Sequence, residues 1–384
     1  MRPTPPGVSA LHLAWRMLAH RPGRALASVT GLAFAVVVMF AQLGFFHAIN
    51  DSAARLAGIF DCDFVVSHPA KTHLRSGEEF PLAWLAELRT VPGVAAAVPF
   101  YSGAAYWWNP HVGDRHRLLL LGVSLEDPMV ALPAVGAHRN ELQLPDRILF
   151  DARSRAELGA PAPGDEARLN DRRVRIAGVF DLGANFTYEG HALCGAEAFA
   201  AVTGQPAAIV DLGLLRLAPG ADPVAVRAAL TARAAGRLSI HTPAELHRRE
   251  VIDIVGRTPT GIVFGIGLAV GLLIGTVVCY QILFTEVHDH QRPLAMLRAI
   301  GHPPGLVSRI VFAEASVLTL TGGILGAVLS HGFHVWLADR TRLPMELTPA
   351  RIAFIGGLAV LMGLLAAWRA AARARRADPA SLFY

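Results

Sequence analysis

Lysine is the residue whose rarity says most about the chemistry open to this chain. The 384 residues include 35 Lys and Arg, and Lys71 is the only Lys among them. A nucleotide-binding P-loop of the form G-x-x-x-x-G-K-[ST] requires a lysine, and none stands in that pattern. Schiff-base chemistry would have to use Lys71, which has no apolar segment around it to lower its pKa. We therefore expect neither a P-loop ATPase site nor a Schiff-base site.

Histidines and acidic residues show no spacing that suits a metal or a catalytic centre. The sequence contains no H-E-x-x-H, G-x-S-x-G or C-x-x-C motif. His288 and His290, on either side of Asp289, resemble a pair of metal ligands. Because they follow a long apolar run, we interpret them as the solvated end of a helix. His68 and His73 lack a matching partner. We predict no catalytic residue, no metal site and no cofactor bound by this chain.

The three cysteines limit the redox chemistry. Cys279 falls inside an apolar run, where it is expected to serve as a small apolar residue. Cys62 and Cys194 both lie in the long polar segment, where a disulfide is permitted. Sequence alone does not show that they meet, so we expect two free thiols.

Apolar runs predict the elements that would position any functional group. Hydrophobic residues make up 53% of the chain and charged residues only 17%, below the roughly 25% of soluble domains. As helices, residues 25–50 and 258–285 would each be about 40 Å long, against about 30 Å of hydrocarbon. With 310–338 and 352–368 they predict four transmembrane helices. The first run is too long for a signal peptide and is interpreted as an uncleaved anchor.

Arginine placement predicts how these helices are oriented. Eleven Arg lie in the segments 1–24, 286–309 and 369–384, whereas the short loop 339–351 holds three. The positive-inside rule makes the eleven cytoplasmic, so both termini are inside and residues 51–257 are outside. The net charge of +5 is then largely an orientation signal, and nucleic-acid binding loses its main support.

The outer segment is long enough to form a domain with its own core. Strands are predicted at 63–66 and 117–123 and in a hairpin of 166–169 and 173–180. Helices are predicted from Pro81 and from Pro223, with Asp222 as the cap of the second. The aromatic stretch 106–108 would contact a partner or a lipid, or fill the core, and we favour the core. The predicted fold is a membrane α-helical protein with four transmembrane helices and a large α+β periplasmic domain inserted between helices 1 and 2.

Small residues recur at helical spacing within the second predicted span. The glycines concerned are Gly261, Gly265, Gly267, Gly271 and Gly275. Spacings of four allow two helices to approach closely, so these positions predict tight packing within the chain or across a dimer. The segment 1–24 is an elbow helix at the cytoplasmic surface, because its apolar residues from Val8 to Leu18 have helical spacing.

The cytoplasmic loop 286–309 contains a second short helix. Residues 293–301 begin with Pro and end with Gly, which is typical of a helix that lies at the membrane surface. Such a helix either docks into another protein or merely connects two spans.

The order of these segments resembles permeases of the MacB, LolC and FtsX superfamily of ABC systems, and the whole chain looks like DevC-type permeases. The similar pieces are residues 39–45, 164–186, 280–283 with Asp289 and His290, 297–301 and 377–380. The cytoplasmic loop departs from the family pattern, because Pro293 stands where an acidic residue commonly precedes the L-[RK]-A-[IM]-G run.

The resemblance implies a homodimer in the bacterial inner membrane that exports a lipid, glycolipid or other hydrophobic substrate. A DevA-like ABC ATP-binding subunit would supply ATP and Mg, a DevB-like membrane-fusion adaptor would bind in the periplasm, and a TolC-like channel would continue through the outer membrane. It also implies that the ATPase pushes on the cytoplasmic loop. The coupling residues would be Pro293, Leu297, Arg298, Ala299 and Gly301.

Two other functions compete with export. An FtsX-like regulator would use the same ATPase cycle to control a periplasmic enzyme, without transport. An integral membrane enzyme would need paired polar residues inside the spans, and His331 and His334 are the nearest candidates. We expect these two to be interfacial or packing histidines, and nothing in 51–257 identifies a substrate.

Overall fold

The computed structural model describes residues 10–20, 22–74, 76, 78–109, 113–289, 296, 300, 303–345 and 348–376. The chain divides into two compact units. We call the first the helical unit, which contains residues 1–46, 263–336 and 345–384, and the second the outer unit, which contains 47–262 and 337–344. The predicted coupling residues and the similar stretch 377–380 lie outside the described residues.

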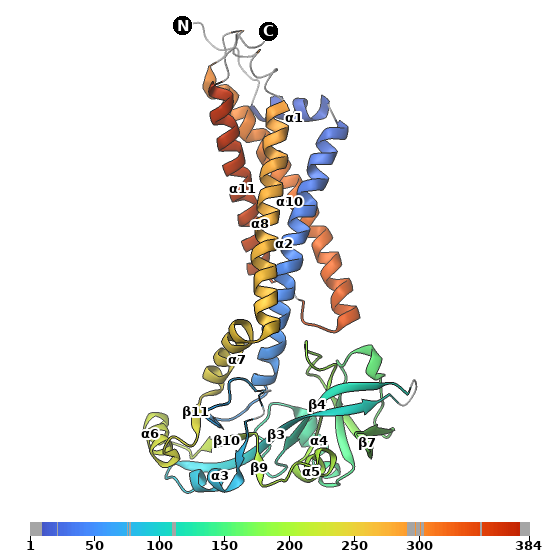
Figure 1. Ribbon diagram of the computed structural model, residues 1–384, viewed down its shortest axis with the longest axis vertical. Helices are drawn as coiled ribbons and strands as arrows, with labels where there is room; N and C mark the ends of the chain where they lie inside the picture. Colours follow the sequence, from blue (N-terminus) through green and yellow to red (C-terminus); the bar gives the residue numbers. More distant parts are fainter. Residues whose placement is uncertain are drawn as a thin grey trace. The chain divides into compact units, whose positions relative to one another are not determined.

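Long helices that lie beside one another make up most of the helical unit (Figure 1). They are α2 (Pro22–Ala57), α8 (Pro259–Asp289), α10 (Pro304–Thr341) and α11 (Pro349–Arg376), and α2, α8 and α10 each continue into the outer unit. The short helix α1 (Ala10–His20) precedes them. Three stretches are long and apolar enough to cross a membrane: Pro22–Ala57, Pro259–Ile282 and Ser308–Thr341. The apolar part of α11, Pro349–Met362, is shorter, so the fourth span stays a prediction.

The centre of the helical unit is formed largely by α2. Met39, Phe40 and Val36 of this helix are buried, and they share a cluster with Leu318 of α10 and Ile355 of α11. Helix α1 buries Ala14 and Leu18 and exposes Leu11 and Trp15. An exposed Leu and Trp on a short surface helix suit an interfacial helix, as predicted for the N-terminal elbow.

Half of the outer unit is a four-stranded antiparallel sheet with two helices. In chain order its elements are β1 (Phe64–Ser67), α3 (Leu82–Arg89), β3 (Val94–Trp108), β10 (Leu212–Leu217), α6 (Pro223–Ala234) and β11 (Ser239–His241). The strands lie in the order β11-β1-β10-β3. Two β-α-β units interleaved in this way form the split βαβ arrangement.

The remaining strands continue the same sheet and close on themselves. They are β4 (Arg115–Val123), β5 (Arg147–Asp151), β6 (Glu166–Leu169), β7 (Arg172–Phe180) and β8 (His191–Gly195). Their order from β3 is β4-β8-β5-β7-β6, and β6 pairs back with β3. The first part of β3 pairs with β10 and the rest with β4, so this strand joins the open half to the closed half.

Smaller elements complete the outer unit. They are the pair β2 (Phe80–Pro81) and β9 (Ile209–Val210), the helices α4 (Pro133–Ala137), α5 (Ala196–Thr203) and α7 (Pro243–Arg257), and short 3₁₀ turns at Glu141–Gln143 and Ala156–Leu158. Helix α7 begins with a capping box in which the Thr242 side chain accepts from the Glu245 N–H. This cap satisfies backbone groups that would otherwise lack a partner.

Most local predictions for the outer unit are confirmed. Strands β4, β6 and β7 cover the predicted ranges, and Asn170 in the turn between β6 and β7 has φ +53°. Asp222 caps α6 by accepting from Val224 N at 3.0 Å. Two boundaries differ: β1 is shifted by one residue, to Phe64–Ser67, and α3 begins at Leu82 with Pro81 as its N-cap residue.

The aromatic stretch divides between the core and the surface, because neighbouring residues on a strand point to opposite faces. Trp107 is fully buried, and its Nε1 donates to Leu158 O at 2.9 Å. Tyr106 is exposed and lies under the Arg115 guanidinium, 3.9 Å from the ring centroid. The prediction of a core role is therefore confirmed for Trp107 and wrong for Tyr106.

Candidate functional site

Glycines of α8 face α2 inside the helical unit. A Cβ added at Gly271 would lie 2.5 Å from Gln42 Cγ, and one at Gly275 would lie 2.6 Å from Met39 Cγ. At Gly267 the nearest atom would be Gln42 Oε1, at 3.1 Å. A side chain at Gly271 or Gly275 would displace Gln42 or Met39 of α2, and one at Gly267 would need only the end of the Gln42 side chain to shift, so glycine favours this close contact.

The other two glycines of the predicted ridge are placed differently. A Cβ at Gly265 would meet only Phe46 Cε2, at 3.9 Å. Gly261 belongs to the outer unit, and its N–H donates to Thr258 Oγ1 at 3.1 Å. Gly261 therefore contributes to the first turn of α8.

Helix α10 approaches α2 through glycines as well. A Cβ at Gly326 would lie 2.8 Å from the backbone oxygen of Ala33, and one at Gly322 would lie 2.8 Å from Leu32 Cβ. His334 packs against Gly44, and its Nδ1–H donates to Ser330 O at 2.6 Å. His334 is thus a packing histidine, as expected.

Two described residues of the loop predicted to be cytoplasmic have exposed apolar side chains. Met296 and Ile300 are 62% and 72% exposed, and Ile300 N donates to Met296 O at 3.1 Å, as in one helical turn. Side chains four residues apart lie on the same face of a helix. Our sequence reasoning named other residues of this loop and missed these two, although their apolar type and spacing were visible.

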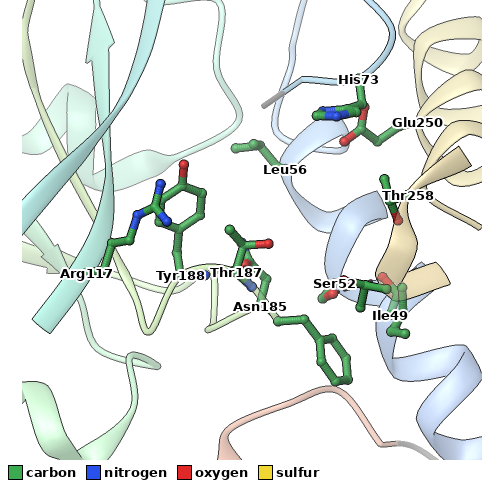
Figure 2. A pocket seen from close by; sticks show the side chains of 12 residues that line it. Ile49, Ser52, Leu56, His73, Arg117, Asn185, Thr187, Tyr188, Glu250 and Thr258 are labelled. Atoms are coloured by element: carbon green, nitrogen blue, oxygen red, sulfur yellow. Dashed lines mark hydrogen bonds between the residues drawn. The ribbon is translucent and has the colours of Figure 1, made fainter. Parts of the chain in front are cut away.

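The outer unit contains a pocket of about 270 Å³. Figure 2 shows Arg117 and Tyr188 on one side, Asn185 and Thr187 at the base, and Ser52, Thr258 and Glu250 opposite. The other lining residues are Ile49, Leu56, His73, Phe186 and Thr260. Every one of these side chains belongs to the outer unit.

A buried carboxylate holds the loop that forms the base of this pocket. Asp151 accepts from Leu182 N at 3.0 Å, from Gly183 N at 2.8 Å and from His191 Nδ1 at 3.1 Å. Asn185 Oδ1 in turn accepts from Thr187 N and Tyr188 N, both at 2.8 Å. The loop is therefore fixed by buried hydrogen bonds, which are strong when one partner is charged.

The walls of the pocket carry opposite charges. The Arg117 guanidinium lies 5.1 Å from the centroid of the Tyr188 ring, close enough for a cation–π contact. Glu250 is only 2% exposed, and its Oε2 accepts from Leu74 N at 2.7 Å. These two charged groups, with His73 and several hydroxyl groups, suit recognition of a small polar ligand.

The lone lysine is buried, which corrects the expectation of an unshielded side chain. Lys71 Nζ donates to Asp211 Oδ1 at 2.6 Å and to Ser76 O at 2.5 Å. Asp211 Oδ2 accepts from Ser102 Oγ at 2.5 Å. Burial raises the pKa of Asp211, and the Lys71 charge opposes that rise. The ion pair connects the segment after β1, which carries Lys71, to Asp211, which directly precedes β10.

The cysteines of the outer unit form no disulfide. Cys62 and Cys194 are both free, as expected. Burial, followed by the charges of Asp63 and Asp61, raises the pKa of Cys62 to about 12, and burial raises the pKa of Cys194. The side chain of Cys279 is outside the described residues. Among the residues that the structure describes, no three His, Cys, Asp or Glu side chains are grouped to hold a metal.

Two family descriptions match this chain. The MacB-like periplasmic core domain matches residues 25–233, and the FtsX-like permease C-terminal domain matches residues 265–379. A search of curated proteins gives no match.

Three solved structures similar to the chain have low sequence identity to it. The periplasmic region of MacB from Actinobacillus actinomycetemcomitans is 9% identical, with 50% of this chain and 93% of that one covered and a TM-score of 0.38. The extracellular domain of the noncanonic ABC-type transporter YknZ from Gram-positive bacteria is 11% identical, with coverage of 47% and 99% and a TM-score of 0.33. A domain of a putative permease protein from Porphyromonas gingivalis is 17% identical, with coverage of 47% and 86% and a TM-score of 0.30.

Proposed function

The chain belongs to the MacB/LolC/FtsX superfamily of ABC permeases, and from that premise we propose that it is the permease subunit of a DevC-type tripartite exporter. Proteins of this superfamily are membrane subunits of ABC systems with a periplasmic domain. The proposal adds a direction of transport, which is outward, and a class of substrate, which is a lipid, glycolipid or other hydrophobic molecule.

These 384 residues supply no P-loop lysine. Lys71 is the only lysine among them, and it forms a buried ion pair with Asp211 in the outer unit. The DevC-type proposal assigns the P-loop to a separate ATP-binding subunit. The exposed pair Met296 and Ile300 suits a docking surface for that ATPase, because exposed apolar side chains at helical spacing are typical of helix-in-groove recognition.

The helices support a mechanical link between ATP hydrolysis and the outer unit. Helix α2 is unbroken over 36 residues, about 54 Å at 1.5 Å per residue. It contacts α8 and α10 at glycines, where an added Cβ would approach side chains of α2 or, at Gly326, the backbone oxygen of Ala33. Closely packed helices move as rigid bodies, so a push on the cytoplasmic loop would displace α8 and α10 together with α2.

The assembly proposed around this chain follows from the DevC-type assignment. Two copies would pair in the bacterial inner membrane, with both termini cytoplasmic, and bind two DevA-like ATP-binding subunits. A DevB-like adaptor would dock on the outer unit and lead to a TolC-like channel. The ATP and Mg would be held by the ATPase alone.

An FtsX-like regulator is the second candidate, since the C-terminal match is to the FtsX-like permease C-terminal domain, which is common to both candidates. Both functions need an ATPase, but only export moves a substrate. The test is to purify the full chain from its native host, to identify any ATPase and adaptor that co-purify, and to reconstitute the complex in vesicles that contain lipids from that host.

Export predicts that ATP drives release of a specific lipid to the adaptor, detected by mass spectrometry. A catalytically inactive ATPase in the same vesicles is the matched control. Stimulated ATP hydrolysis with no lipid released, together with activation of a periplasmic hydrolase, would instead establish the regulator and overturn export.

A further inference from the structure

Helix α7 places its residues against the usual pattern of a surface helix. Glu250 and Asp253 are buried, with 2% and 5% exposure, whereas Ile252 is 60% exposed. A helix on the surface of a domain normally turns its apolar side chains to the core and its charged side chains to water. Folding of the outer unit alone therefore gives no reason for the exposed apolar side of α7.

That side of α7 lines a groove of about 650 Å³, whose lining residues all belong to the outer unit. The helix contributes Arg248, Val251 and Ile252, which share one face because they are three and four residues apart. The exposed isoleucine is thus part of a concave apolar surface and not an isolated side chain. Apolar surfaces of this kind are typical of binding sites.

The second segment that lines the groove is apolar and already fixed. Ala57 and Phe60 are buried at 2% and 7% exposure. The ring of Phe60 packs edge-on against Phe100, with the centroids 5.1 Å apart, and its backbone forms a bridge with Val130. A wall that needs no ordering when a ligand binds favours affinity.

Among the described residues that line the groove, the polar side chains are both basic. They are Arg248 and His247, which are exposed and form no ion pair with a carboxylate in the part of the chain that the structure describes. The acidic side chains of α7 hold other groups, in the ion pairs Arg227–Glu245 and Arg257–Asp253 and in the bond from Leu74 N to Glu250. The groove therefore favours a ligand with negative charge.

Shape and charge together define one class of ligand. A volume of about 650 Å³ falls within the range of about 300–1,000 Å³ for ligand cavities, and apolar walls suit an alkyl chain. The fork of the Arg248 guanidinium matches a carboxylate, which can accept two parallel hydrogen bonds. A carboxylate also balances its single charge, whereas a phosphate monoester carries about −1.5 to −2.

We propose that this groove binds a single-chain amphiphile with a carboxylate headgroup. The alkyl chain lies along Val251, Ile252 and Phe60, and the carboxylate binds Arg248. His247 supplies a further N–H donor. Binding rests on the groove alone; that the amphiphile is a molecule on its way out of the cell rests on the proposed function.

The test uses the full-length chain in phosphatidylcholine nanodiscs at alkaline pH, where the carboxylate is ionised. Myristate and myristyl alcohol, each with the same photoreactive diazirine in its chain, are compared, and mass spectrometry of the peptides locates the label. Labelling of the predicted spans corrects for the amount of probe in the bilayer. We expect myristate to label residues 57–60 and 243–252 at least about tenfold more than the alcohol does. Equal corrected labelling by the two probes would overturn the proposal.

Variants assign the charged and the apolar part separately. Arg248→Gln should reduce labelling by myristate to the level of the alcohol, because the charge that binds the carboxylate is lost. Ile252→Gln should reduce labelling by both probes, because the apolar wall is interrupted. Both side chains are exposed, so neither result depends on a disturbed core.

Arg233→Gln is the matched control, since Arg233 is exposed on α6 and does not line the groove. An equal loss in this control would show a general charge effect and contradict the assignment. Excess unlabelled myristate should abolish labelling of the groove but not of the spans, because only a binding site saturates. Labelling of the groove that does not saturate would mean that no site exists there.

A second copy of the chain is the other occupant that this experiment can detect. If the groove stays unlabelled and Ile252→Gln separates a dimer into monomers, the groove is a contact between copies and the proposal is wrong. The measurement uses no ATPase, so its outcome is independent of the proposed export function.

Discussion

At the scale of single residues, the buried pair of Lys71 and Asp211 offers the sharpest test of the outer unit. Replacing Lys71 by Met leaves the Asp211 carboxylate buried without its cation. We expect a loss of about 3–5 kcal/mol in unfolding free energy. The double variant Lys71→Met, Asp211→Asn should recover most of it, because Asn can still accept from Ser102 Oγ.

Denaturant unfolding of the full chain, followed by fluorescence of the outer-unit tryptophans, measures these differences. Arg172→Met is the exposed control and should change the unfolding free energy by no more than about 0.5 kcal/mol. A loss as small as this in the Lys71 variant would mean that the pair does not hold the fold.

His241 makes the stability of the outer unit depend on pH. Burial, and then the charge of Arg249, lowers the pKa of His241. Arg249 Nη1 is 2.6 Å from His241 Nε2, a contact that requires the neutral imidazole. In the unfolded chain the His241 imidazole takes up a proton at about pH 6.5, whereas in the folded chain it takes one up only at lower pH. The free energy of unfolding therefore falls as the pH drops below about 6.5.

The prediction is a lower melting temperature at pH 5.5 than at pH 7.5, with the difference reduced in His241→Gln. His247→Gln, an exposed residue of α7, is the control and should keep the full difference. An unchanged pH dependence in the His241 variant would assign the effect to other groups.

At the scale of elements, the contact of α10 with α2 depends on Gly326, whereas Gly323 of the same helix makes no such contact. A Cβ at Gly326 would lie 2.8 Å from the backbone oxygen of Ala33, which cannot move aside as a side chain can. Gly323 lies in the same helix and has nothing within 4 Å of such a Cβ. Gly326→Val should therefore destabilise the chain by about 1–3 kcal/mol.

Gly323→Val is the matched control, because it adds the same side chain to the same helix in open space. Thermal unfolding of the two variants in detergent gives the comparison. Equal melting temperatures would show that α2 and α10 are not packed this closely.

The cytoplasmic loop gives a second prediction at this scale. Met296→Asp and Ile300→Asp place a charge on the exposed apolar face and should uncouple ATP hydrolysis from transport, with a loss of at least about 1–2 kcal/mol in ATPase binding. Met296→Leu keeps the apolar surface and is the control. Replacing Arg298 or Gly301 should also weaken the coupling of ATP hydrolysis to transport, while the complex stays assembled. Unchanged transport in all these variants would contradict docking of the ATPase through the loop.

The elements that could be predicted are those with strong local signals. The hairpin of β6 and β7 has alternating residues around an Asn-Asp turn, and α6 has Asp and Pro at its start. Strand β3 was not predicted because it begins with Val-Ala-Ala-Ala-Val, residues that are not typical of strands. It forms because β10, β4 and β6 pair with it, and long-range pairing overrides weak propensity.

The pocket could not be predicted for the same reason. Its lining comes from α2, α7, the start of α8, β4 and the loops after β1 and β7, which are distant in sequence. Arg117 and Glu250 have no spacing that links them, so only the fold places them on one pocket. The packing glycines of α8 and α10, in contrast, follow one another along each helix at a spacing of four, which is visible in the sequence.

At the scale of the whole molecule, the membrane topology is the prediction on which export depends. Positive-inside charge places residue 114 outside and residue 375 inside. Asp114 is exposed, so Asp114→Cys offers an accessible thiol, and Arg375→Cys offers one near the C-terminus. A membrane-impermeant maleimide added to intact spheroplasts should label position 114 at once, and position 375 only after permeabilisation.

The native thiols decide how clean this measurement is. Maleimide reacts with the thiolate, and a pKa of about 12 leaves Cys62 almost wholly protonated at neutral pH. Cys194 is fully buried, so these two contribute little background, and Cys279→Ala removes the third. Labelling of position 375 in intact spheroplasts, with position 114 protected, would show that the topology is the reverse of the predicted one. The outer unit would then lie on the same side of the membrane as the ATPase.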